Sequence, residues 1–162
     1  MNKITVDATE LREETLLIKR CALVVKGGRR FSFSAYVVVG NENGILGLGH
    51  GKASDVAGAI AKASKEARRK LFSVEIAENT VPHRINGKFT SSNILIMPAK
   101  PGTGVIACTP VRAIMQMAGI HDVLTKSFGS NNTVNLAKAT IDGLKKMRSR
   151  KTVEALRGVE LA

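Results

Sequence analysis

Acidic residues, aromatic residues and cysteine are all scarce in this sequence of 162 residues. Its 13 Asp and Glu stand against 25 Lys and Arg, which gives a formal net charge of +12. There are only two cysteines, Cys21 and Cys108, and they form no CxxC pair. We therefore expect two reduced thiols in a cytosolic protein, and neither a disulfide framework nor a cysteine-based metal site.

The sequence also lacks a long hydrophobic run. A membrane-spanning helix needs about 20 apolar residues, whereas the longest uncharged stretches, such as residues 31–41, contain 11. Acidic residues occur near the N-terminus, where a signal peptide would have its apolar core. The sequence therefore predicts a soluble, cytoplasmic protein without a membrane partner, and its positive charge points to a polyanion.

Residues suited to catalysis or metal binding are not grouped along the chain. His50, His83 and His121 lie far apart and lack the spacing of metal ligands. No paired carboxylates stand out as a general acid and base. We therefore expect no enzyme activity, no cofactor, no metal and no small-molecule substrate.

A glycine-rich segment, residues 47–54, fails the tests for a nucleotide-binding loop. A Walker loop would need Gly and Ser or Thr where the sequence has Leu46 and Ala53, and a dinucleotide fingerprint would need Gly in place of Lys52. Two interpretations stay open. The glycines allow close packing of a strand against the following helix, or they let Lys52 approach an RNA phosphate.

The pattern of apolar residues predicts an α+β fold in two modules. In the first module we expect a three-stranded antiparallel sheet with one helix, from strands at 14–25, 31–39 and 45–50 and a helix at 54–72. In the second we expect two layers, from strands at 81–89, 94–97 and 122–125 and helices at 110–118 and 133–147. Asn86-Gly87 predicts a break in the first of these strands.

These elements suggest four parts of the chain. We expect an N-terminal arm at 1–13, a first domain at 14–73, a second domain at 74–148 and a basic C-terminal tail at 149–162.

The positive charge is concentrated in the first module. Residues 19–70 contain 11 bases and 3 acids, whereas residues 71–144 are nearly neutral. The predicted RNA-binding residues fall into two groups of basic residues, together with the two turn glycines inside the first group and a single lysine that follows the glycine-rich strand. They are Lys19, Arg20, Lys26, Gly27, Gly28, Arg29, Arg30, Lys52, Lys62, Lys65, Arg68 and Arg69. The alternative is a solvated charged surface, and the bases at 145–151 are open to the same two interpretations.

The few aromatic residues bear on the kind of RNA. Phe31 and Phe33 share a strand face with Val37 and Val39, so we expect them to pack in the core. Sheets that bind single-stranded RNA need exposed aromatic rings interleaved with basic residues, and this pattern is not expected here. The sequence therefore favours a folded, duplex RNA bound through its phosphates and 2′-hydroxyls.

Several motifs in the same order closely resemble the bacterial small ribosomal subunit protein five family. They are VKGGRRFSFSA at 25–35, VGNENG at 39–44, GLGHGKA at 47–53, PGTG at 101–104, VRA at 111–113, AGIHDVLTKSFGSNN at 118–132 and ATIDGL at 139–144. The resemblance covers about residues 15–148. It implies an N-terminal domain like a double-stranded-RNA-binding fold and a C-terminal α+β domain with a left-handed crossover.

The resemblance also implies a place and partners. Members lie between the head and body of the small subunit, bind its ribosomal RNA, neighbour proteins four and eight, and lie near the messenger RNA entry channel. With proteins four and twelve they bear on decoding accuracy. By position, Lys26–Arg30 matches a loop that enters the RNA of the head, and the segment from Gly104 to Arg112 matches the face toward protein four.

Four positions depart from the family pattern. Leu23 stands where Lys is common and Ile45 where a base is usual, so we expect two fewer RNA contacts. Cys108 stands in place of a small residue, and Thr133 in place of a usual Pro, and neither is expected to break the fold. Two alternatives to a ribosomal protein remain: a free-standing double-stranded-RNA-binding regulator, and a phosphate-handling relative of kinases, against which the failed phosphate-loop spacing counts.

Overall fold

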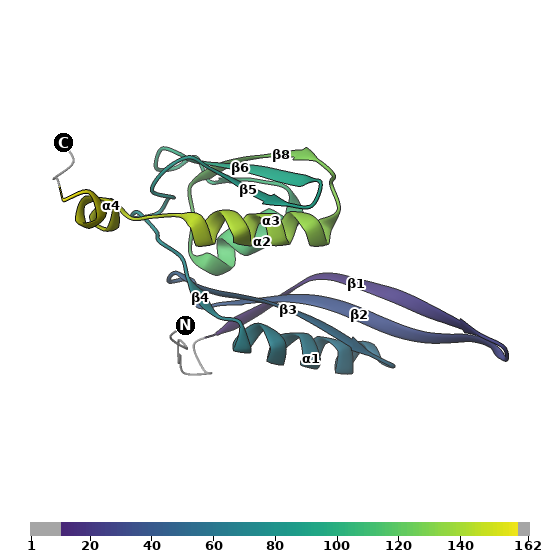
Figure 1. Cartoon of the computed structure of the whole chain (residues 1–162). Coiled ribbons are helices and arrows are strands. Elements are labelled where there is room, and N and C mark those ends of the chain that lie inside the picture. Colours follow the sequence, from purple (N-terminus) through teal and green to yellow (C-terminus); the bar gives the residue numbers. More distant parts are fainter. Residues whose placement is uncertain (1–10, 159–162) are drawn as a thin grey trace.

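The computed structural model describes residues 11–158 and arranges them in two modules (Figure 1). The expectations for residues 1–10 and 159–162, within the N-terminal arm and the C-terminal tail, lie outside the described residues. The first sheet contains strands β1 (Arg12–Val25), β2 (Gly28–Gly40), β3 (Ile45–Ala53) and β4 (Phe72–Ser73) in that spatial order. All its pairs are antiparallel, and helix α1 (Val56–Arg69) packs on one face. The expected three strands and helix are confirmed, and β4 is a short addition.

The glycines of β3 bring α1 unusually close to the sheet. A Cβ atom at Gly47, Gly49 or Gly51 would lie 2.4, 1.9 or 2.1 Å from a backbone oxygen of α1. The helix presents buried alanines to this surface, Ala59, Ala63 and Ala67. Of the two interpretations of the glycine-rich segment, close packing is therefore confirmed for these glycines. They are needed because any side chain would displace the helix backbone.

The second sheet is mixed. Its strands are β5 (Ile85–Phe89), β6 (Ser92–Pro98), β7 (Val105–Ile106) and β8 (Val123–Gly129), in the order β5-β6-β8-β7. Only β7 and β8 pair in parallel, and helix α2 (Thr109–Ala118) connects them. Helix α3 (Thr133–Lys146) follows β8 and packs on β5 and β6. The α+β fold is confirmed; the left-handed sense of the crossover stays a prediction.

Asn86-Gly87 does not break a strand, so that prediction is wrong. Both residues lie inside β5, and the chain turns instead at Thr90-Ser91, between the paired residues Phe89 and Ser92. A Cβ atom at Gly87 would lie 2.0 Å from the carbonyl oxygen of Ala139 in α3. This glycine therefore allows close packing of α3, and no turn is involved. The expected strand at 81–89 is shorter than predicted, since β5 begins at Ile85.

The ends of the second-module elements differ from the predictions in three further places. Helix α2 begins at Thr109, one residue before the predicted start, and its N-cap is Cys108, whose side chain makes no cap hydrogen bond. Strand β8 continues to Gly129, beyond the predicted end at residue 125. The expected tail contains a helix, α4 (Arg150–Arg157), with Ser149 as its N-cap. Thr133 begins α3 without disturbance, because Asn132 accepts a hydrogen bond from the N–H of Val134.

The two modules share one hydrophobic core. Val38 and Leu46 of the first sheet are fully buried in the same cluster as Ile114 and Met115 of α2. Figure 1 shows α2 and α3 between the two sheets, with α1 on the outer face of the first sheet. Backbone hydrogen bonds reinforce this joint, from Glu42 N–H to the Met117 oxygen at 3.1 Å and from Gly44 N–H to the Ala118 oxygen at 2.9 Å. The modules are therefore a single packed unit.

Candidate nucleic-acid interface

The β1–β2 hairpin extends well beyond the rest of the first sheet (Figure 1). The last residue of β3, Ala53, pairs with Phe33, so residues 28–32 of β2 have β1 as their only neighbouring strand. We call residues 19–32 the distal hairpin. Their side chains are mostly exposed on both faces of the two-stranded ribbon. This segment therefore packs little against the rest of the molecule.

The chemistry of the distal hairpin suits an anionic partner. It contains the five bases of the first predicted group and no acidic residue. Lys26 and Gly27 form its two-residue turn, and Gly28 has a φ of +124°, a conformation that side chains rarely adopt. A Cβ atom at Gly27 or Gly28 would meet nothing within 4 Å. The tip is thus narrow, and its backbone is open to close approach by a ligand.

The strand register divides four of the five bases between two faces, and Lys26 lies in the turn. In an antiparallel sheet, directly paired residues point to the same face, and neighbours along a strand point to opposite faces. Arg29 pairs with Val24, and Arg20 pairs with Phe33, a residue on the α1 side. Arg30 pairs with Leu23 and is on the opposite side, with Lys19. The sequence did not predict this division, because it depends on the register.

The face opposite α1 carries a basic row across three strands. Lys19 pairs with Ser34, which in turn pairs with Lys52. Neighbouring strands are about 4.8 Å apart, so the two lysines start about 10 Å from each other. Next to this row, His50 shares a hydrogen bond of 2.7 Å with Ser34. The structure therefore groups Lys52 with the hairpin bases.

The bases of α1 are not equivalent. Lys62, Lys65 and Arg69 are exposed, and Lys62 donates a hydrogen bond of 3.3 Å to the backbone oxygen of Lys52. Arg68 instead forms an ion pair of 2.9 Å with Glu13 of β1. Its charge is therefore already matched within the protein, which the spacing of bases along the sequence does not reveal.

Acidic residues near these bases have partners of their own. The side chain of Lys70 bonds to Glu66, and this bond, followed by the His50 N–H at 2.8 Å, lowers the pKa of the Glu66 carboxyl. The Gly58 N–H lowers the pKa of the Asp55 carboxyl, which caps α1. Both groups are thus held as carboxylates in local bonds. They do not neutralise the distal hairpin.

Phe31 is not in the core, so that prediction is wrong. Its side chain is 50% exposed, whereas Val37 on the same strand face is 1% exposed. The reason is that β3 ends opposite Phe33 and α1 packs no further along the ribbon. The guanidinium carbon of Arg20 lies 3.6 Å from the Phe31 ring centroid. An exposed ring among bases is therefore present after all.

The predicted protein-binding segment lies at the edge of the second module. Gly104 has a φ of +74°, and its N–H donates a bond of 2.8 Å to the buried carboxyl of Asp122. Arg112 is exposed on the first turn of α2, and Ile106 in β7 is also exposed. Between Gly104 and Arg112 the exposed residues are Ile106, Cys108 and Thr109, whereas Pro110 and Val111 are buried. The role of this segment toward a protein partner stays a prediction.

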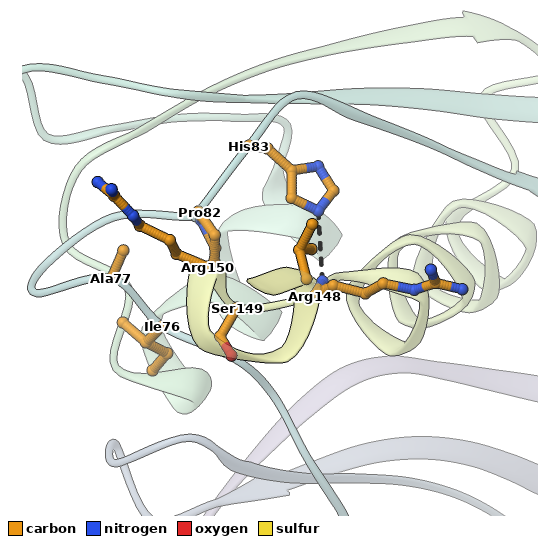
Figure 2. A pocket seen from close by; sticks show the side chains of 8 residues that line it. Ile76, Ala77, Pro82, His83, Arg148, Ser149 and Arg150 are labelled. Carbon is orange, nitrogen blue, oxygen red and sulfur yellow. Dashed lines mark hydrogen bonds between the residues drawn. The ribbon is translucent and has the colours of Figure 1, made fainter. Parts of the chain in front are cut away.

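A groove of about 590 Å³ lies between α4 and the segment that joins the modules (Figure 2). Its lining includes His83, Ile76 and Val153, with Arg148 and Arg150 beside them. The Arg148 N–H donates a bond of 3.3 Å to Nε2 of His83. Sequence reasoning missed this groove, because the expected tail contained no helix to form its wall.

The described residues offer no metal site and no membrane span. Within residues 11–158, no three His, Cys, Asp or Glu side chains are grouped so that they could hold a metal ion. No helix of this part of the chain is long and apolar enough to cross a bilayer.

Comparison with known proteins points to one family. Residues 11–75 match the family described as ribosomal protein S5, N-terminal domain, and residues 87–157 match ribosomal protein S5, C-terminal domain. The small ribosomal subunit protein uS5 of Rhodopirellula baltica is 49% identical over 149 residues, which cover 92% of this chain and 84% of that protein. The exposed basic hairpin, the two α+β modules and both matches agree, and the chain belongs to the ribosomal protein S5 family.

Proposed function

We propose that this protein binds ribosomal RNA between the head and body of the small ribosomal subunit, with the distal hairpin as its main RNA-contacting element. As a member of its family it is a structural protein of the small subunit and not an enzyme. Its place of action is therefore the cytoplasm. The observation that carries the proposal is a basic ribbon, free of acidic residues, that extends beyond the packed part of the molecule.

The two faces of the distal hairpin contact RNA on both sides. Arg20 and Arg29 bind phosphates on the α1 side together with Lys62 and Lys65. Lys19, Arg30 and Lys52 do so on the other side. A ribbon that carries bases on both faces fits a junction in which RNA surrounds it, and Gly27 and Gly28 keep its tip thin enough to enter. Phosphate contacts of this kind supply affinity and position rather than base specificity.

The second module serves as a docking body. The segment from Gly104 to Arg112 binds small-subunit protein four, and protein eight and the messenger RNA at its entry channel are further neighbours. Through these contacts the protein contributes to decoding accuracy. The shared core supports this division of roles, because a contact on one module is rigidly related to a contact on the other.

Charge reversal tests the role of the distal hairpin. Arg29→Glu combined with Arg30→Glu should sharply reduce incorporation into small subunits, measured by sucrose-gradient sedimentation of cell lysate. The matched control reverses two exposed bases of the second module, Lys100→Glu with Lys126→Glu. Full incorporation of the hairpin variant would refute the proposal. Absence of the unaltered protein from small-subunit fractions would favour a free-standing RNA-binding regulator instead.

A further inference from the structure

Phe31 and Arg20 form a stacked pair on the distal hairpin that neither the fold nor phosphate binding explains. The central carbon of the guanidinium lies over the ring, 3.6 Å from the ring centroid. Phe31 belongs to neither hydrophobic core and is 50% exposed. It shares its face of the ribbon with Val24, which is also exposed, so the two side chains form an apolar patch within a basic segment, the kind of surface that marks a binding site.

The surroundings of the pair leave it open to a ligand. Directly across the ribbon from Phe31 is Ala22, whose side chain is too small to cover the ring. Val24, two residues further on the same face, is 71% exposed. On the other edge of β2 no strand pairs with Phe31, because β3 ends opposite Phe33. The pair is therefore accessible from the unpaired edge of β2 and from the side of the hairpin tip.

We propose that Phe31 and Arg20 form a stacking platform for an unpaired nucleobase of RNA. Planar guanidinium groups stack on aromatic rings and on nucleobases. Exposed aromatic rings among basic residues are the usual platform for unstacked nucleotides. The charge of the segment selects the class of ligand, since Arg20 and Arg29 on this face have no acidic residue opposite them in the ribbon. The hairpin then binds phosphates with its basic residues and one unpaired nucleobase with the platform. This inference rests on the proposed RNA binding, and it adds a contribution to the RNA affinity that depends on a nucleobase.

The platform separates two kinds of RNA ligand. A phosphate contact depends only on charge, so it does not distinguish an oligonucleotide from an abasic chain of equal length. A stacking contact requires the base. The ratio of the affinity for the oligonucleotide to the affinity for the abasic chain therefore separates the contribution of the platform from that of the basic residues around it.

The experiment uses the full chain and two fluorescent probes, a single-stranded oligoadenylate of twelve nucleotides and an abasic ribose-phosphate chain of the same length. Because removal of one stacking ring costs about 1–3 kcal/mol per base, we expect the unaltered protein to bind the first probe at least about fivefold more tightly. Phe31→Leu keeps an apolar side chain but loses the ring, so the ratio should fall to about one. Phe31→Tyr should restore it, and Arg20→Lys should lower it while keeping the charge.

Phe128→Leu is the matched control, because Phe128 is 49% exposed on β8 in the other module. It should leave the ratio unchanged. An unchanged ratio in Phe31→Leu, with circular dichroism equal to that of the unaltered protein, would overturn the platform and leave the proposed phosphate binding intact. If the unaltered protein bound both probes equally and with strong salt dependence, the platform alone would fail. If it bound neither, the proposed RNA binding would fail with it.

Discussion

The contact between β3 and α1 makes the sharpest prediction about stability. Gly49 lies under the middle of α1, and Gly49→Ala adds one methyl group there. That Cβ would lie 1.9 Å from the carbonyl oxygen of Ala63 and 2.5 Å from the backbone nitrogen of Ala67. Both are backbone atoms of the helix, so no side chain can rotate away to relieve the overlap.

The size of the effect follows from the movement needed. Real Cβ contacts are not shorter than 3.0 Å, so α1 would have to move by about 1.1 Å at this point. Gly47 and Gly51 allow a similar close approach on either side, at 2.4 and 2.1 Å. The overlap lies at the middle of this contact, so the helix has to move away from the sheet and loosen the contacts of its buried alanines. Overpacking of a core costs about 1–3 kcal/mol, and we expect about 3 kcal/mol here.

Thermal unfolding followed by circular dichroism measures this cost. For a protein of this length, about 3 kcal/mol lowers Tm by about 6–12 °C. Gly27→Ala is the control: a Cβ at Gly27 meets nothing within 4 Å, and we expect a change within about 0.5 kcal/mol. Equal Tm values for the two variants would refute the account of the glycine-rich strand.

Three further predictions concern charged groups. Lys65→Ala should reduce the salt dependence of RNA affinity by about one counterion, whereas Arg68→Ala should leave that slope unchanged, because Arg68 is already paired with a glutamate of β1; equal losses in titrations at several salt concentrations would contradict this. The lowered pKa of Glu66 means that its bonds stabilise the fold above the ordinary carboxyl pKa of 4.5 and that this stabilisation is lost as the pH falls. Glu66→Gln should therefore be less stable than the unaltered protein in urea at about pH 7, by a margin that shrinks toward about pH 3; a constant margin would count against the assignment. Asp122→Ala leaves the Gly104 N–H without its partner and should cost about 1–3 kcal/mol in urea unfolding, while an unchanged midpoint would show that this bond adds nothing.

Much of the fold was predictable because local patterns agree with the tertiary structure. The alternation of apolar residues in β2 and the four-residue spacing in α1 reflect faces that are buried in fact. Glycine was the ambiguous signal. Gly49 and Gly87 both allow a helix to approach a strand, yet Asn86-Gly87 has the sequence of a turn. Only the neighbouring helix distinguishes the two roles, and its position is a tertiary property.

The residues that make up the candidate site could be predicted from the sequence, but the arrangement of their side chains on the surface could not. The five bases of the distal hairpin were evident in the sequence, whereas the division of four of them between two faces required the register of β1 and β2. Phe31 continues the apolar face of Phe33 and Val37, but this face is covered only as far as β3 and α1 extend. The pairing of Arg68 with Glu13 joins residues far apart in sequence. Each of these differences arises from contacts between segments that are remote along the chain.

The most direct test of the account is ultraviolet cross-linking of the protein to RNA in purified small subunits, with the modified peptides identified by mass spectrometry. Binding of ribosomal RNA by the distal hairpin predicts nucleotide adducts on peptides from residues 19–32, with Phe31 among the modified positions. Adducts confined to the second module, with none on residues 19–32, would contradict the central claim that this hairpin is the main RNA-contacting element.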